Sequence, residues 1–382
     1  MANLTYTINI TKNDAFTLSP VTYYYILLGN RIGTILYSII YILGFVGNAF
    51  AFITFSNSRM RLISSSIFLL ILSISDTIAL ITSLWFFLGD AFSIQLQNYS
   101  ALACRFRTFF AYVFMDLSSW CLAGLALDRF LRTEIPLRAR IICTPRNAMI
   151  MISICFLVLC GINGHYFSPG IGQERGGNRT TAHCLENRDE FPKYYYFYKI
   201  IWPKIDMIIF CFLPACIMIF CNVRIIHILR RNRHHCESQG HENEKIKITN
   251  IQQALNGNSP KRKNQSRRKA IERQMSLIMS YCVVIFLCTT VPVTIYLIFI
   301  EQFVVHHPNL ARNNVYYIFA FRLLRAIMYV HFASNFYLYC LTSRIFRDEF
   351  LKTITCRRYI IKESLDDGTS LGLNKIGEIS TV

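Results

Sequence analysis

Two acidic residues inside long apolar stretches are the side chains in this sequence best suited to chemistry. Asp76 stands in "LSISDTIAL", and Asp128 stands next to Arg129 at the end of "SSWCLAGLALDRF". A carboxylate in apolar surroundings needs a partner or takes up a proton. The adjacent Asp128 and Arg129 allow two interpretations. In the first, both side chains extend to the membrane surface as an interfacial pair. In the second, they form a charged switch whose pairing differs between the open and the closed state of a helix bundle.

No other pattern in the sequence points to catalysis. We find no phosphate-binding loop, no metal-ligand cluster, no nucleophile motif and no internal repeat. The chain of 382 residues is 53% hydrophobic and 16% charged, with a mean hydropathy of +0.35, whereas soluble domains contain about a quarter charged residues. We therefore expect a membrane protein that is not an enzyme.

Seven runs of mostly apolar residues are long enough to span a membrane, which takes about 20 residues. Each must be helical, because hydrocarbon offers the backbone no hydrogen-bond partner outside its own segment. The runs are 33–55, 67–88, 106–130, 148–166, 200–226, 275–300 and 315–340. They predict an all-α membrane protein, in which a tail over 1–32 precedes a seven-transmembrane helix bundle over 33–342.

Lysine and arginine gather after the first, third, fifth and seventh runs, with a long basic loop predicted over 230–273. Basic residues mark the cytoplasmic side of a membrane protein. We therefore expect a multi-pass protein of the plasma membrane with an extracellular N-terminus and a cytoplasmic C-terminus. The net charge of +18 then reflects topology and attraction to anionic lipid in the bilayer, and not nucleic-acid binding.

On the opposite side of the membrane, the sequence has features typical of an oxidising, extracellular compartment. Of the 14 cysteines, only Cys104 and Cys184 are expected to face it, and we expect a disulfide between them rather than two free thiols. Four sequons for glycosylation also fall on this side, at Asn3, Asn9, Asn98 and Asn178.

Several short motifs stand in order along the seven runs. "GFVGNAF" contains Asn48, "LSISDTIAL" contains Asp76, and Arg129 lies 25 residues after Cys104. The other matches are Pro214, Pro292, Asn335 and Tyr339 in "SNFYLYC", and Phe346. With these residues the sequence resembles the rhodopsin-like (class A) G-protein-coupled receptors, from the first run to the short helix after the seventh.

The resemblance implies a switch at the inner ends of the helices. Asp128 and Glu272 would both hold Arg129 at rest. Activation would swing the sixth span outward about a kink at Pro292, and the opened cleft would take the C-terminal helix of a Gα subunit. Ligand and heterotrimeric G protein would then strengthen each other's binding. The resemblance assigns Phe286, Asn335 and Tyr339 to the same switch.

The resemblance also implies a Na⁺ site at Asp76. Its polar surroundings would come from Asn48, Ser118 and Asn335, and a hard cation with oxygen ligands fits such a site. His331, four positions before Asn335, is atypical of the family. A hydrogen-bond network between helices, with no ion, is the alternative.

Two positions and one run depart from the family pattern. Thr290 stands where most members carry tryptophan, Asn222 stands where tyrosine is usual, and the run 148–166 has no tryptophan. These changes favour an altered basal activity. Taken together, "DRF", Asn222 and "NFxxYC" resemble the invertebrate neuropeptide receptors that recognise FMRFamide-like peptides.

The residues expected around the ligand favour a peptide. Ala111 and Tyr329 occupy the places of the amine-binding aspartate and the retinal lysine, which argues against an amine receptor and a visual pigment. We expect Asp206 to pair with a cationic residue of the peptide, and the alternative is an internal pair of Asp206 with Arg325. The full set of candidate ligand residues is Asp206, Trp202, Asp116, Arg325, Arg322 and Glu186.

The C-terminal part carries three further features. Residues 343–355 are predicted to form an amphipathic helix on the membrane surface, and Cys356 after it is either palmitoylated or an unmodified thiol. In the tail over 356–382, serines and threonines are candidate sites for arrestin recruitment. The chain ends in "ISTV", in which Ser380 and Val382 match the pattern of a PDZ-domain ligand.

The sequence leaves three functions open. The leading interpretation is a G-protein-coupled receptor, for a neuropeptide, that signals by outward movement of its sixth transmembrane helix. The second is a receptor-like protein that does not signal or is constitutively active. The third is a membrane transporter that uses its intramembrane acids as a proton path, and the lack of an inverted repeat argues against it.

Overall fold

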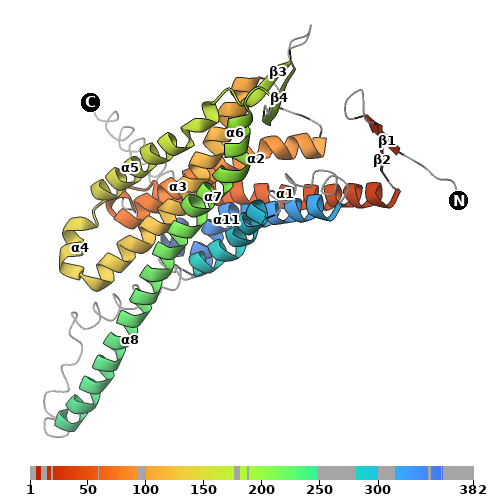
Figure 1. The fold of residues 1–382 in the computed structure, drawn as a ribbon. Helices are drawn as coiled ribbons and strands as arrows, with labels where there is room; N and C mark the ends of the chain where they lie inside the picture. Colours follow the sequence, from red (N-terminus) through yellow and green to blue (C-terminus); the bar gives the residue numbers. More distant parts are fainter. Residues whose placement is uncertain are drawn as a thin grey trace, which may run out of the picture.

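The computed structural model is an elongated bundle of helices that lie side by side (Figure 1). It describes residues 6–9, 15–18, 20–58, 60–92, 94, 96, 100–175, 181–186, 189–247, 281–299, 315–342, 346–353 and 355. The long helices are α1 (Pro20–Phe55), α2 (Ser64–Phe92), α3 (Ala101–Glu134), α5 (Pro145–Asn163), α8 (Leu213–Lys247), a helix over Tyr281–Phe299, and α11 (Val315–Thr342).

The predicted seven-span, all-α membrane fold is confirmed. Within the described residues, six helical segments are long and apolar enough to cross a membrane. They are Arg31–Phe55, Ser64–Gly89, Ala101–Glu134, Pro145–Phe167, Pro192–Arg231 and Tyr281–Phe299. The seventh element is α11, which packs against α1 and α2 and carries two arginines, Arg322 and Arg325, in its first half.

Large apolar side chains cover the outside of the bundle as well as its core. Ile35, Ile39 and Ile42 on α1 are exposed, and so are Ile154 and Leu157 on α5. An exposed apolar surface of this extent is costly in water, but it suits a helix surrounded by lipid. The helices therefore bury their polar residues against one another and present their apolar faces outward.

Local sequence signals explain where several helices begin. Ser100 caps α3, because its side-chain oxygen accepts a hydrogen bond from the N–H of Ala103 at 3.0 Å. Thr144 caps α5 in the same way, and Pro145 follows at the first helical position. Between them, the short α4 (Pro136–Ile142) also starts with a proline.

The fifth span is interrupted rather than regular. It consists of α6 (Pro192–Tyr196), α7 (Trp202–Asp206) and α8, separated by the π-helical turns η4 (Phe197–Ile201) and η5 (Met207–Phe212). Pro203 follows η4 and Pro214 follows η5. A proline removes one backbone hydrogen bond from the helix and crowds the preceding turn, which accounts for a locally wider helix before each of them.

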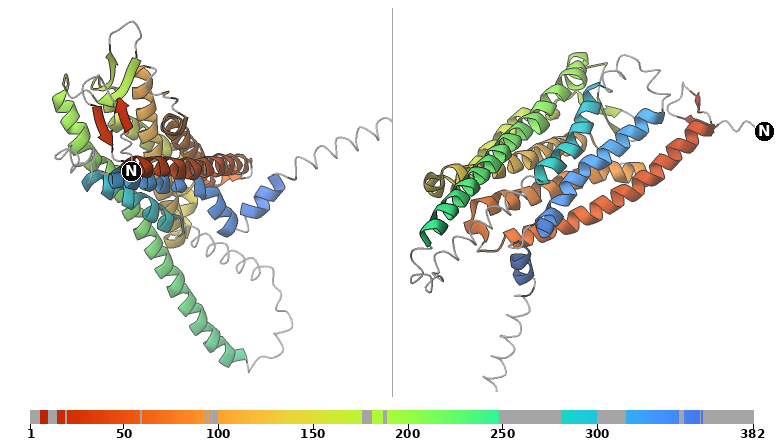
Figure 2. Two further views of the ribbon diagram at one scale, coloured as in Figure 1. Left: turned by 90° about the vertical axis from the view of Figure 1, so that its right-hand side faces the viewer. Right: turned by 90° about the horizontal axis from the view of Figure 1, so that it is seen from below.

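Two antiparallel hairpins, which the sequence analysis did not predict, complete the fold. One pairs β1 (Tyr6–Asn9) with β2 (Ala15–Leu18), and the other pairs β3 (Ile171–Arg175) with β4 (Thr181–Glu186). Figures 1 and 2 place the β3–β4 hairpin at one end of the bundle, while α8 extends beyond the other end. We call these the hairpin end and the Asp128 end. Two short 3-10 turns, η1 (Met60–Leu62) and η3 (Gly164–Phe167), lie in the connections.

The segments that flank the bundle are partly helical. Helix α1 begins inside the predicted tail 1–32, and α8 continues into the predicted loop 230–273 as far as Lys247. Residues 346–353 are helical within the predicted amphipathic segment, where Phe346 is buried and packs on Phe55 and Tyr339. The remainder of the loop and the tail 356–382 lie outside the described residues.

Candidate functional site

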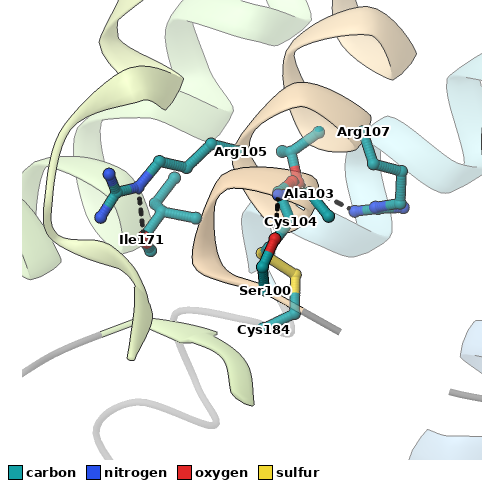
Figure 3. Close-up of a disulfide and its surroundings, with 8 residues drawn as sticks. Ser100, Ala103, Cys104, Arg105, Arg107, Ile171 and Cys184 are labelled. Carbon is teal, nitrogen blue, oxygen red and sulfur yellow. Dashed lines mark hydrogen bonds between the residues drawn. A yellow bond between two sulfur atoms is a disulfide. The ribbon is translucent and has the colours of Figure 1, made fainter. Parts of the chain in front are cut away.

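A disulfide fastens the β3–β4 hairpin to the start of α3 (Figure 3). It joins Cys104 to Cys184, whose Cα atoms are 5.4 Å apart, and the prediction for this pair is confirmed. The side chain of Arg105 adds a hydrogen bond from its Nε to the carbonyl oxygen of Ile171 at 2.8 Å. Gly172 has a φ of 78°, and a Cβ there would lie 2.9 Å from the Cα of Ala101. Glycine therefore lets the hairpin lie directly on α3.

Beneath the hairpin, a cavity of about 270 Å³ lies between α2, α3, α7, the helix over Tyr281–Phe299 and α11. Three of the predicted ligand residues line it, namely Trp202, Asp206 and Arg325. Asp116 and Arg322 are not among the lining residues, and the side chain of Glu186 lies outside the described part of the structure. The cavity thus brings together half of the predicted ligand set.

The charged groups of this cavity are mostly basic. Arg107, Lys199 and Arg325 line it together with a single acid, Asp206. Asp206 forms no ion pair or hydrogen bond with the residues that the structure describes, so the alternative of an internal Asp206–Arg325 pair is not realised. The Asp206 carboxylate is therefore available to a cationic group that enters from the hairpin end.

Aromatic side chains pack behind Trp202, which lines the cavity together with Asp206. The ring of His165 lies 4.0 Å from that of Trp202 and 4.2 Å from that of Tyr166, measured between centroids. The Nδ1 of His165 is 3.0 Å from the hydroxyl of Tyr194, which comes from the aromatic run before α7. This aromatic packing holds the Trp202 ring at the cavity wall, and it explains the dense aromatic sequence between residues 191 and 202.

Asp116 has a different environment from the one predicted. Its side chain is 2% exposed, and its Oδ2 accepts a hydrogen bond from Asn163 Nδ2 at 2.9 Å. The same amide nitrogen also bonds to the carbonyl oxygen of Leu159 at 3.1 Å. Asp116 therefore joins α3 to α5 behind the cavity wall, and Asn163 is a partner that the sequence analysis did not identify.

The polar network predicted around Asp76 is present in the middle of the bundle. Asp76 is fully buried, and its two carboxylate oxygens accept hydrogen bonds from Ser118 Oγ at 2.5 Å and from Asn335 Nδ2 at 2.8 Å. These contacts tie α2 to α3 and to α11. Asn48 instead donates to the carbonyl oxygen of Phe332 at 3.0 Å, which ties α1 to α11.

At the Asp128 end, the Asp128 carboxylate bonds to residues other than its neighbour Arg129. Ser64 Oγ donates to it at 2.5 Å, Ser65 Oγ at 2.7 Å and Arg132 Nε at 3.0 Å. The guanidinium of Arg132 also bonds to Ser64 Oγ at 2.7 Å and to the carbonyl oxygen of Cys143 at 2.9 Å.

This arrangement has a simple helical cause. Residues four apart lie on the same face of a helix, so Arg132 reaches Asp128 whereas Arg129 points elsewhere. Ser64, Ser65 and Arg132 were not predicted, although the four-residue spacing of Asp128 and Arg132 was a usable signal. Glu272 lies outside the described residues, so its pairing with Arg129 stays a prediction.

Phe286, which the resemblance assigns to the switch, makes buried aromatic contacts in the middle of the bundle. The ring of Phe286 lies 5.2 Å from that of His331 and 6.2 Å from that of Phe210. Thr290, at the position where most members of the family carry tryptophan, is fully buried and donates to the carbonyl oxygen of Phe286 at 2.6 Å. A small threonine therefore leaves Phe286 and His331 as the large groups that fill this level of the bundle.

Tyr339 is buried between helices at the Asp128 end. Its ring lies 6.0 Å from that of Phe55 and 5.7 Å from that of Phe346. Its hydroxyl has no hydrogen-bond partner among the described residues. Pro292 lies within the helix over Tyr281–Phe299, as predicted.

Most predicted modification sites cannot be placed. Asn3, Asn98, Asn178, Cys356, Ser380 and Val382 lie outside the described residues. Asn9 is the last residue of β1, but its side chain is not described.

Comparison with known proteins gives one extended match and several partial ones. The sequence profile of the family described as "7 transmembrane receptor (rhodopsin family)" matches residues 47–343. Galanin receptor type 2 of Mus musculus is 26% identical over 147 residues, which are 38% of this chain and 39% of that receptor.

Two further relatives show the same pattern of partial similarity. The galanin-like G-protein coupled receptor npr-9 of Caenorhabditis elegans is 29% identical over 154 residues, 40% of this chain and 35% of that receptor. The human cysteinyl leukotriene receptor 2 is 28% identical over 201 residues, 51% of this chain and 54% of that receptor. The chain thus spans between 35% and 54% of the lengths of these three relatives.

Proposed function

Because the chain belongs to the rhodopsin family of seven-transmembrane receptors, whose profile covers residues 47–343, we propose that it is a receptor for a peptide that acts on a heterotrimeric G protein. Members of this family are signalling receptors of the plasma membrane and not enzymes. The relatives named as galanin or galanin-like receptors support a peptide ligand. The finer assignment, to receptors for FMRFamide-like peptides, is a proposal that rests on "DRF", Asn222 and "NFxxYC".

The observation that carries the ligand proposal is the unpaired Asp206 in the cavity beneath the hairpin. A carboxylate without a protein partner is expensive to keep in a partly buried site, and a cationic residue of a peptide would supply the missing charge-assisted hydrogen bonds. Trp202, Tyr198 and Tyr329, which line the cavity, would pack against its apolar neighbours. The basic Arg107 and Arg325 would face acidic or carbonyl groups of the same peptide.

The test is a peptide screen on cells that express this chain with a promiscuous Gα subunit. For any active peptide, Asp206→Asn is expected to raise the half-maximal concentration about tenfold or more, because a hydrogen bond to a charged group contributes about 1.5–3 kcal/mol. Asp189→Asn is the matched control, because Asp189 is exposed and does not line the cavity. Unchanged potency of the Asp206 variant at equal surface expression would exclude this contact.

A ligand of the kind named in the cysteinyl leukotriene receptor 2 is the second candidate. The cavity favours it in one respect, because three cationic side chains face a single acid. An anionic ligand would depend on Arg107 or Arg325. Potency that falls in Arg325→Gln but not in Asp206→Asn would therefore favour this candidate over a cationic peptide residue.

For signal transmission we propose the switch that the family resemblance implies. Arg129 and Glu272 would form its latch, since Asp128 is held instead by Ser64, Ser65 and Arg132. The helix over Tyr281–Phe299, which contains Pro292, would move outward to admit the G protein. The N-terminus would be extracellular and the C-terminus cytoplasmic. Arrestin and a PDZ domain would bind the tail, palmitate would attach at Cys356, and glycans would attach at the four sequons. Ligand-dependent nucleotide exchange that is lost in Arg129→Ala, at unchanged expression, is the measurement that checks the latch.

Na⁺ at Asp76 is the one inorganic group that the family implies. Its carboxylate and the hydroxyl of Ser118 suit a hard cation, but Asn335 presents its amide N–H to Asp76, and an N–H group cannot ligate a metal. No cluster of three or more metal-binding side chains occurs within the described ranges. We therefore propose an ion-free hydrogen-bond network in the conformation seen here.

A further inference from the structure

Asp116 and Asn163 form a buried pair that joins α3 to α5 behind the wall of the ligand cavity. Both side chains are enclosed by the bundle. Asp116 Oδ2 accepts a hydrogen bond from Asn163 Nδ2 at 2.9 Å. Within the described residues, neither Asp116 Oδ1 nor Asn163 Oδ1 has a hydrogen-bond partner. Buried polar atoms are almost always paired, so two unpaired oxygens on one contact need a physical explanation.

The neighbours of Asn163 fix the orientation of its amide group. Asn163 Nδ2 carries two hydrogens, and they point to Asp116 Oδ2 and to the carbonyl oxygen of Leu159, which is 3.1 Å away. If the amide were turned over, its oxygen would lie against these two acceptors. Asn163 Oδ1 is therefore an acceptor that needs a donor, and it belongs to an amide group that already contacts the Asp116 carboxyl group.

An ionised Asp116 cannot supply that donor. A carboxylate only accepts hydrogen bonds, whereas a protonated carboxyl group carries one O–H donor. A hydrogen on Asp116 Oδ1 can be donated to Asn163 Oδ1, which pairs both unpaired oxygens at once. The carboxylic acid and the amide then exchange two hydrogen bonds, and no charge is left inside the bundle at this point.

The charges around Asp116 are consistent with an uncharged acid. The negative charge of Asp206 on α7 acts on Asp116, and Met115, the residue before Asp116, lines the cavity together with Asp206. On α5, the titratable neighbour of Asp116 is the thiol of Cys155. Two carboxylates that interact in this way are costly to ionise together, and one proton removes the repulsion. The basic residues of this region line the cavity, which Asp116 does not, and they are Arg107, Lys199 and Arg325.

We propose that Asp116 is a proton-binding residue, which carries a hydrogen on Oδ1 and forms a carboxylic acid–amide pair with Asn163, so that Asp206 keeps the negative charge of the ligand cavity. A cation bound to Asp206 would offset its charge and make ionisation of Asp116 easier. Binding of a cationic group and release of this proton are therefore linked. The link rests on the proposed ligand contact of Asp206, whereas the acid–amide pair does not.

The first test compares two substitutions of Asp116 in the purified full chain. Asparagine has the shape of the neutral acid, with one acceptor oxygen and an N–H group in place of the O–H group. Asp116→Asn is therefore expected to keep both bonds to Asn163 and to leave the thermal midpoint unchanged. Asp116→Leu removes both bonds and is expected to lower it. Equal losses in the two variants would show that Asp116 is ionised, and would overturn the proposal.

The proton itself is detected by infrared difference spectroscopy of the full chain in a detergent without ester groups. A protonated carboxyl group has a C=O stretching band that is separate from the bands of a carboxylate. One such band is expected at neutral pH in the unmodified chain, and it should be absent from Asp116→Asn. Asp189→Asn, which changes an exposed acid, is the matched control and should keep the band.

Asp206→Asn tests the link to the ligand cavity, because it removes the charge that a bound cation would offset. Ionisation of Asp116 then costs less, so its band is expected to disappear at a lower pH than in the unmodified chain, at a proton concentration about tenfold higher. Asp189→Asn should lose the band at the same pH as the unmodified chain.

Two spectroscopic results would overturn the proposal. If no carboxyl band depends on Asp116, the residue is a carboxylate whose Oδ1 bonds to a water molecule or a cation. If the band disappears at the same pH with and without the Asp206 charge, the proton is not linked to the ligand cavity. None of these measurements involves a peptide or a G protein, so their outcome is separate from that of the test of the proposed function.

Discussion

The Asp76 carboxylate is enclosed on all sides, and both of its oxygens accept hydrogen bonds from other helices. Buried polar groups are tolerated when they are fully paired. The donors are a hydroxyl, from Ser118, and an amide N–H, from Asn335. His331, four residues before Asn335 on α11, is buried, and its ring nitrogens have no partner among the described residues. An imidazole ring at this position brings no negative charge that would attract a cation.

Because the Asp76 carboxylate is already hydrogen-bonded within the protein, we expect the thermal stability of the protein not to depend on Na⁺. Exchange of Na⁺ for choline at constant ionic strength is expected to leave the thermal midpoint of the purified protein unchanged. Asp76→Leu is expected to lower the free energy of unfolding by about 1–3 kcal/mol, because Ser118 and Asn335 lose their shared acceptor. A midpoint that rises with Na⁺ in the unmodified protein but not in Asp76→Leu would instead establish a sodium site.

Sequence patterns located these residues, but they did not always identify their partners. The family resemblance predicted that Ser118 and Asn335 lie around Asp76, and in the structure both donate hydrogen bonds to its carboxylate. Asp128 was expected to hold the adjacent Arg129, but its partners come from the start of α2 and from the next helical turn. Partner choice depends on how helices are rotated about their axes, which motif order along the chain does not specify.

At the scale of helices, Arg132 is the residue that joins three elements. It pairs with Asp128 on α3, bonds to Ser64 at the start of α2, and bonds to the carbonyl of Cys143 in the connection between α4 and α5. Asp128 itself is 5% exposed, whereas Arg132 is 35% exposed. The pair is therefore partly screened by solvent, and its main effect is to keep a nearly buried carboxylate satisfied.

Arg132→Met is accordingly expected to lower the free energy of unfolding by about 1 kcal/mol, the typical net value of a lost hydrogen-bonded contact. The change keeps an unbranched side chain but removes the charge and all three donors used here. Arg138→Met is the control, because Arg138 is exposed on α4. Thermal unfolding of the two variants side by side gives the measurement, and equal midpoints would show that the Arg132 contacts do not stabilise the fold.

Hydropathy predicted the positions of the helices but not their internal breaks. The apolar runs predicted the position of each of the seven long helices that the structure describes, because length and composition decide membrane insertion. The break of the fifth span into α6, α7 and α8 was not predicted, although Pro203 and Pro214 mark the two positions. The β3–β4 hairpin was not predicted either. Its strands are short and mostly polar, and they pack against α3.

For the molecule as a whole, the hairpin end is where three separate parts of the chain are brought together. The disulfide joins β4 to α3, Arg105 bonds to β3, and Gly172 packs on the backbone of Ala101. Cys104 and Ile171 also belong to a small buried cluster with Tyr166 and Trp202, which is distinct from the main core. The cavity with Asp206 lies directly beneath this cluster, so the hairpin contacts and the ligand site share residues.

Removal of the disulfide should therefore affect stability and ligand binding together. Cys104→Ala/Cys184→Ala is expected to lower the free energy of unfolding by about 2–4 kcal/mol, because the bond closes a long loop and limits the unfolded chain. Ligand potency should fall as well, because Trp202 would lose the ordered cluster that holds its ring at the cavity wall. Cys216→Ala, which removes an exposed free thiol, is the matched control for both measurements. A double variant with the thermal midpoint and potency of this control would mean that Arg105 and Gly172 hold the hairpin on α3 without the covalent bond.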